Sequence, residues 1–217
     1  MTPPPSGPTP AAPRDDQPGT YVSTGTLPPA EQMQTLVAEA YERFRTDDEG
    51  VVADYIPALA DAAPSLFGIS VVGVGGAVFS AGDTAVEFSM QSVSKPFVFA
   101  LVCQAIGSYA TRDHLGVDST GLPFNSVMAV ELNDDRTMNP MVNRGLCEHS
   151  GDWLYEVGLP GKSGVSGGIV TMSPGKGGLG TYSPRLDPAG NSVRGQRATK
   201  YLSERLGLNL FASEPYR

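Results

Sequence analysis

The chain has 217 residues with 15 basic and 23 acidic side chains, a length that suits one ordinary domain with a sizeable core. The acidic balance, without a basic cluster, argues against nucleic acid or an anionic membrane as a partner, so we expect a small-molecule substrate. No apolar segment approaches the length of a membrane span, and no apolar signal core follows a basic N-terminus, which makes the cytoplasm the expected location.

The cysteines and histidines do not form a recognisable site. Cys103 and Cys147 are too few for a disulfide framework and lack the spacing of metal ligands. His114 and His149 stand alone in the sequence. We therefore predict no metal site and no cofactor.

Residues 1–29 are rich in Pro, Thr, Ser and Gly. Such a segment buries too little apolar area to offset the entropy lost on ordering, so it is predicted to be a disordered tail, with a Pro-rich binding segment as the alternative. The folded domain is expected to cover residues 30–212.

The first elements of that domain have clear periodicities. In residues 30–45 the apolar positions recur every three or four residues, and this predicts an amphipathic helix that ends at Thr46–Gly50. A short helical or turn segment is expected around Ala53–Pro57. Two apolar, β-branched runs, residues 66–74 and 77–80, then flank Gly75–Gly76 and predict a β-hairpin.

The sequence changes character at Gln91–Pro96, where a polar stretch meets the apolar run of residues 97–102. Proline is tolerated only near the start of a helix, so Pro96 places Ser92 at or just before the first turn of a helix that we expect to be buried. Gly107 is expected to end this helix.

Ser92 and Lys95 are three residues apart and are predicted to share one helical face. A lysine kept neutral by apolar surroundings can accept the serine proton, and a helix N-terminus favours the negative charge that develops, so the pair suits a nucleophile and its base. The structural alternative is a serine N-cap beside a solvated lysine. A second S-x-x-K, at Ser173–Lys176, falls in a predicted turn and is interpreted as accidental.

The second motif is Lys162-Ser163-Gly164, followed by a glycine-rich apolar run to Met172. Serine acyl-transfer enzymes with an S-x-x-K nucleophile carry K-[ST]-G on the strand that faces it, where small residues let backbone amides approach the substrate carbonyl. The two motifs occur here in the expected order.

The remaining pattern completes the predicted fold. An apolar run at residues 127–132 follows the central helix, residues 153–157 and 163–172 are predicted to be strands, and a turn at residues 174–178 leads into a further strand at residues 179–183. Asn191–Ser192 is expected to cap a terminal helix that Gly207 closes. This order predicts an α+β domain in which terminal helices cover one face of an antiparallel sheet.

Together these motifs resemble the serine-dependent glutaminases, which share the fold of the β-lactamases and penicillin-binding proteins. The matching segments lie between about Ala30 and Phe211: Ala53-Asp54-Tyr55-Ile56-Pro57, Phe67-Gly68-Ile69-Ser70, Ser80-Ala81-Gly82-Asp83, Gln91-Ser92-Val93-Ser94-Lys95, Asn139-Pro140-Met141-Val142-Asn143, residues 157–165 and Gly190-Asn191-Ser192-Val193.

The resemblance implies hydrolysis of L-glutamine to L-glutamate and ammonia through an acyl-enzyme. It makes Ser92 the nucleophile, Lys95 its base and Tyr55 a hydroxyl near both. It also implies that Asn143 binds substrate and that the amides of Ser92 and Val165 form the oxyanion site. A primary amide is an acyl donor that needs no metal, which agrees with the reading from the residues.

The sequence departs from the family pattern near residues 143–147. In glutaminases the segment after the Asn-Pro-Met-Val-Asn motif is long and helical, whereas here Asn143 runs almost directly into Arg144–His149. Most of the family's helical subdomain is therefore expected to be absent, together with several substrate-binding residues. A family tyrosine aligns with Cys147, and a thiol cannot replace a phenol.

These features predict a glutaminase weakened by an internal deletion. Two alternatives stay open: a serine amidase or penicillin-recognising acyl transferase, which the same two motifs permit, and a non-catalytic remnant that binds partners or forms a homo-oligomer.

Overall fold

The computed structural model describes residues 25–116, 122, 126–132 and 150–211. In chain order the elements are α1 (Ala30–Phe44), α2 (Pro57–Ala60), β1 (Gly68–Gly73), β2 (Val78–Gly82), the 3₁₀ turn η1 (Gln91–Val93), α3 (Ser94–Ile106), α4 (Ser108–Leu115), α5 (Val127–Glu131), α6 (Ser150–Glu156), β3 (Gly161–Ser163), β4 (Gly168–Ser173), β5 (Gly177–Tyr182) and α7 (Val193–Arg205).

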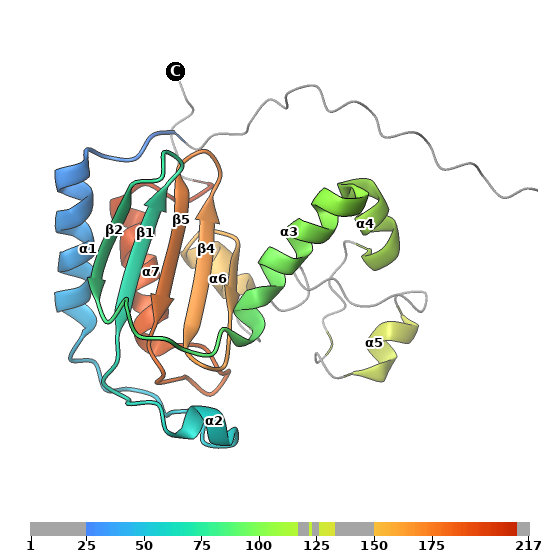
Figure 1. Ribbon diagram of the computed structural model, residues 1–217, viewed down its shortest axis with the longest axis horizontal. Coiled ribbons are helices and arrows are strands. Elements are labelled where there is room, and N and C mark those ends of the chain that lie inside the picture. The colour runs from blue at the N-terminus through green and yellow to red at the C-terminus, as the bar shows by residue number, and fades with distance from the viewer. Residues whose placement is uncertain (1–24, 117–121, 123–125, 133–149, 212–217) are drawn as a thin grey trace, which may run out of the picture.

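The strands form one antiparallel sheet in the order β2-β1-β5-β4-β3. Strands β1 and β2 make the predicted hairpin, with Ser70 opposite Ser80, and β5 pairs with the other edge of β1. Figure 1 shows α7 behind the sheet and α1 beside β2, and both helices contribute to the core cluster on that face, whereas no described helix crosses the front. The predicted α+β architecture, with terminal helices on one face, is confirmed.

The core lies between the sheet and these helices. Side chains alternate along a strand, so Ile69, Leu179 and Ile169 point to the same face and are buried there. They belong to one cluster with Met33 of α1 and Leu202 of α7, both fully buried. Fully burying a side chain of this size contributes about 1.5–3 kcal/mol, so this cluster provides most of the stabilisation of the domain.

Leu27 packs against the core, so folded structure begins before Ala30. Its side chain lies beside Gly73, where a Cβ would stand 3.3 Å from the leucine methyl group. Leu27 thus supplies apolar contact to the domain from within residues 1–29, and the boundary at residue 29 stays a prediction.

Two arginines at the start of α7 fix the loop that follows α1. The Nε of the buried Arg194 donates to the carbonyl oxygen of Asp47 at 2.5 Å, and its Nη1 donates to that of Ser65 at 3.0 Å. Burial lowers the pKa of the Arg194 guanidinium, as does nearby Arg185. One turn later, Arg197 forms exposed ion pairs with the carboxylates of Asp47 and Glu49.

Two of the predicted strands are wrong. Residues 153–157 were expected to be extended, but they belong largely to α6, because Trp153 and Val157, four residues apart, bury one helical face and the indole Nε1 donates to Leu159 O at 2.8 Å. The single strand expected over residues 163–172 is two strands, β3 and β4, joined by a tight turn in which the N–H of Gly167 donates to Gly164 O.

The burial expected for the central helix is also wrong. Helix α3 begins and ends as predicted, with Pro96 in its first turn and Gly107 at φ +86° after its last residue. However, none of its residues is buried, because no described element covers it along its length. Among the described residues no single helix is long and apolar enough to span a membrane; the pair Gln91–Ile106 and Ser108–Leu115, bent by 118°, passes that test on length and composition only.

Candidate active site

Ser92 lies in the 3₁₀ turn η1, directly before α3, and is half-buried. The residue before it, Gln91, has φ +48°, and no other non-glycine residue in the described ranges has a positive φ. This left-handed conformation costs about 1–2 kcal/mol in a residue with a Cβ. It is held by the Ser94 hydroxyl, which donates to Gln91 O at 2.8 Å, and by the Gln91 side chain, whose Nε2 donates to Ser89 Oγ.

The K-S-G motif packs against this serine turn. A Cβ at Gly164 would lie 3.1 Å from Met90 O and 3.3 Å from Gln91 Cβ, so only glycine fits without displacing one segment or the other. Strand β3, which ends at Ser163, is the edge of the sheet nearest to η1. The structure thus brings together the two motifs that the sequence analysis paired.

Two backbone donors are available where these turns meet. Neither the N–H of Ser92 nor that of Val165 makes a hydrogen bond among the described residues. Both belong to segments that touch through Gly164. Two unoccupied N–H groups in contacting turns, one of them at the start of a helix, can stabilise an oxyanion.

The K-S-G motif is anchored by a buried hydrogen bond to the segment that directly precedes the terminal helix α7. Ser163 Oγ donates to Asn191 Oδ1 at 2.7 Å, and Lys162 Nζ donates to the carbonyl oxygen of Ser163 at 2.7 Å. All three residues are buried. Sequence reasoning assigned Asn191 only to a helix cap, although its place in the Gly190–Val193 family motif was a signal of a further role. Ser192 takes the cap, since its Oγ accepts from the N–H of Gly195.

The other predicted site residues are either exposed or outside the described residues. Lys95 is exposed, so the described residues do not supply the apolar surroundings expected for it. Tyr55 is also exposed, although Ile56 beside it packs in a small cluster with Val165. This cluster brings the Tyr55 segment next to the K-S-G turn. Asn143 and Cys147 lie outside the described residues.

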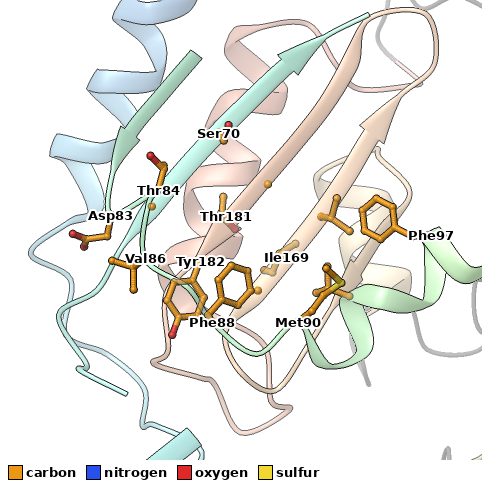
Figure 2. A pocket seen from close by; sticks show the side chains of 15 residues that line it. Ser70, Asp83, Thr84, Val86, Phe88, Met90, Phe97, Ile169, Thr181 and Tyr182 are labelled. Atoms are coloured by element: carbon orange, nitrogen blue, oxygen red, sulfur yellow. The ribbon is translucent and has the colours of Figure 1, made fainter. Parts of the chain in front are cut away.

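An apolar pocket of about 250 Å³ lies over the front of the sheet, beside η1. Figure 2 shows Phe88 and Tyr182 side by side, and their rings stack at a centroid distance of 4.1 Å; Met90 and Phe97 lie to one side of them. Burial raises the pKa of the Tyr182 phenol. Ser92 is not among the lining residues, so this pocket neighbours the serine without containing it.

No group of three or more His, Cys, Asp or Glu side chains among the described residues is placed to hold a metal ion. The features that the described site does contain are the serine turn, the edge strand packed on it and the two available amides.

The antiparallel sheet, the terminal helices on one face and the S-x-x-K turn against the K-S-G strand define a domain of the serine β-lactamase-like fold. The family model described as Glutaminase matches this chain over residues 50–147 and 144–211. The chain belongs to the glutaminase family.

Individual relatives agree with this assignment. The chain is 38% identical over 319 aligned positions to Glutaminase 2 of Yersinia pestis, an alignment that covers 90% of this chain and 94% of that protein. The solved structure of the probable glutaminase ybaS superposes with a TM-score of 0.78 at 27% identity and covers 85% and 99% of the two chains. A probable glutaminase from Bacillus subtilis, complexed with 6-diazo-5-oxo-L-norleucine, has the same fold, with a TM-score of 0.64, 22% identity and coverage of 85% and 97%.

Proposed function

We propose that this glutaminase hydrolyses L-glutamine to L-glutamate and ammonia through an acyl-enzyme on Ser92, at a rate reduced by an internal deletion. The observation that carries the mechanism is the pair of available N–H groups, Ser92 and Val165, in turns that touch through Gly164. The substrate is supported by the Bacillus subtilis relative, whose ligand has the amino-acid end of glutamine and a diazoketone at the position of its amide.

The proposed reaction has two halves. Lys95 accepts the proton of the Ser92 hydroxyl as Oγ attacks the carboxamide carbon, and the two amides stabilise the oxyanion. The proton then passes to the leaving nitrogen, with Tyr55 as a hydroxyl near both groups, and ammonia departs. A water molecule attacks the resulting ester, giving glutamate and restoring Ser92. The reaction requires no metal or cofactor.

Substrate recognition is the weaker half of the site. Asn143 is proposed to bind glutamine. We also propose that the protein forms a homo-oligomer and is located in the cytoplasm. The Yersinia pestis alignment spans 319 positions although the chain has 217 residues, and the two family-model matches meet at residues 144–147. This supports a gap close to Asn143. Orientation of a substrate in a closed pocket contributes about 7 kcal/mol or more, so we expect turnover to be lower by several orders of magnitude than in a complete relative.

The exposure of Lys95 supports a reduced rate as well. The base role proposed for Lys95 calls for apolar surroundings, which the described residues do not supply. Lys95→Ala should abolish the remaining turnover without unfolding the protein. Lys95→Arg should be nearly as damaging because a guanidinium stays protonated.

The test is ammonia release from glutamine by the purified chain, by Ser92→Ala and by a chimera that carries the missing segment of a complete relative. We expect low turnover in the chain, none in Ser92→Ala and strong turnover in the chimera, while Cys147→Tyr gives no rescue. Equal background in the chain and in Ser92→Ala would refute catalysis and favour the non-catalytic remnant. Turnover in the chain equal to that of the chimera would refute the effect of the gap. Labelling of Ser92 by a fluorescent penicillin would instead favour the penicillin-recognising alternative.

A further inference from the structure

Helix α3 presents an unusually apolar surface to solvent. No charged residue occurs between Phe97 and Ile106. Phe99 in this stretch is half-buried. Five other large apolar residues are between 37% and 64% exposed and occupy one side of the helix: Phe97, Val98, Leu101, Val102 and Ile106. Monomers rarely expose contiguous apolar patches larger than a few hundred Å², so such a helix needs a partner surface.

The front face of the sheet offers a matching surface on the same chain. Strand β5 places Gly178 and Gly180 on this face, and a Cβ at either would meet only one backbone oxygen, at 3.5 Å or 4.0 Å. On the two neighbouring strands Val72 and Met172 stand opposite Gly178 and are 41% and 56% exposed. The result is a shallow apolar trough along β5, with the 250 Å³ pocket at one end.

The helix does not fill the trough of its own chain. Figure 1 shows α3 leaving the sheet at its N-terminal end and running away from it. Of its residues only Phe97 lines the pocket. Among the described residues, the helix and the trough are therefore two apolar surfaces that do not cover each other.

We infer that α3 of one copy docks along the β5 trough of a second copy, and that the second copy returns the same contact. Such a reciprocal, two-fold arrangement satisfies both surfaces at once. The inference specifies the homo-oligomer of the proposed function and does not depend on the reaction proposed there. It makes the deletion a cause of association, since it leaves both surfaces open.

The area is sufficient for a stable dimer. Ten large apolar residues in the two surfaces are about half exposed: Val72, Val86, Phe88, Met90, Phe97, Val98, Leu101, Val102, Ile106 and Met172. At about 200 Å² for each large side chain when fully exposed, covering them removes on the order of 900 Å² per copy, compared with about 800 Å² per partner in a standard interface. The helix surface carries no charge, and Asp83 lines the pocket at the end of the trough. A net charge of −8 disfavours an anionic membrane as the occupant.

The test uses the full chain, with association measured by sedimentation equilibrium. Leu101→Lys damages the helix surface, Met172→Glu damages the trough, and Val74→Lys introduces a charge at a residue that is 74% exposed outside both surfaces. We expect the wild type and Val74→Lys to be dimers at micromolar concentration. Each of the other two variants should raise the dissociation constant at least about tenfold. Circular dichroism confirms that each variant is folded.

An equimolar mixture of Leu101→Lys and Met172→Glu distinguishes helix-on-sheet docking from other contacts. In that heterodimer one contact is wild-type and the other sets lysine against glutamate, so the mixture should associate more tightly than either variant alone. A monomeric wild type would overturn the inference. So would a Leu101→Lys defect without a Met172→Glu defect, which indicates helix-on-helix pairing, or flotation of monomers with phosphatidylcholine vesicles, which indicates a membrane surface. Ammonia release is measured separately, so failure of catalysis and failure of association are distinguishable.

Discussion

Arg194 and Arg197 allow a direct comparison of buried and exposed interactions with one loop. Both lie in the first turns of α7 and both contact Asp47. The Arg194 side chain is 4% exposed and donates to backbone carbonyl oxygens, whereas that of Arg197 is 41% exposed and pairs with carboxylates. We expect Arg194→Met to destabilise the domain far more than Arg197→Met.

The magnitudes follow from the partners. Hydrogen bonds from a charged donor contribute about 1.5–3 kcal/mol each, and their loss leaves the carbonyl oxygens of Asp47 and Ser65 without these donors. After allowing for the desolvation that lowers the pKa of Arg194, a net cost of about 3 kcal/mol is expected for Arg194→Met. That corresponds to a fall in Tm of about 6–12 °C in a chain of this size. Exposed ion pairs typically contribute about 0.5 kcal/mol each, so losing both pairs should cost about 1 kcal/mol and lower Tm by about 2–4 °C in Arg197→Met.

The assay is thermal unfolding followed by circular dichroism at low salt and at high salt. The Arg197→Met effect should shrink at high salt because exposed pairs are screened, whereas the Arg194→Met effect should persist. Equal falls in Tm for the two variants would refute the assignment of the loop's stability to buried hydrogen bonds. So would a fall in the Tm of Arg194→Met that disappears at high salt.

Three further predictions concern other parts of the fold. Gly164→Ala should lower Tm by a few degrees and abolish residual turnover, because its Cβ meets Met90 O at 3.1 Å; unchanged melting and turnover would contradict the close packing of the two turns. Deleting residues 1–24 should leave Tm unchanged, whereas deleting residues 1–29 removes Leu27 and should cost about 1 kcal/mol, or about 2–4 °C. Tyr182 has a raised pKa when folded, so its contribution is present below about pH 10 and lost as pH rises above that value. In urea unfolding, the free energy of unfolding of the wild type should therefore fall more between pH 9 and pH 11 than that of Tyr182→Phe. Equal falls in the two proteins would refute the assignment of this pH dependence to Tyr182.

The sequence correctly predicted those elements in which the period of the apolar residues matches the buried face. Helix α1 and the hairpin of β1 and β2 have apolar periods that match their buried faces, and Gly75–Gly76 suits the turn. The contact between the S-x-x-K and K-S-G motifs followed from motif order, although nothing in the spacing indicated that Gly164 would be the residue that touches Met90.

The wrong predictions concern elements whose secondary structure or burial depends on tertiary packing. Aromatic residues favour strands, yet the segment around Trp153 is helical because one side of α6 meets the core and Trp153 Nε1 finds Leu159 O. For α3 the apolar composition predicted burial, but composition does not show whether a covering surface exists. The exposure of Lys95 and Tyr55 has the same origin.

The large core cluster has a consequence for how this chain tolerates the loss of a long segment. Its described members come from residues before Gly82 and after Asp152, with Met33 near one end of the chain and Leu208 near the other. The residues between these two parts form, in effect, one large loop that closes on the cluster. Closure entropy depends only logarithmically on loop length, so a loop of about 70 residues in place of one about 100 residues longer changes the closure cost by about 0.8 kcal/mol, in favour of folding. The sheet and its terminal helices can thus persist when the middle of a glutaminase is shortened, and the effects that we propose for such a change concern the reaction and association.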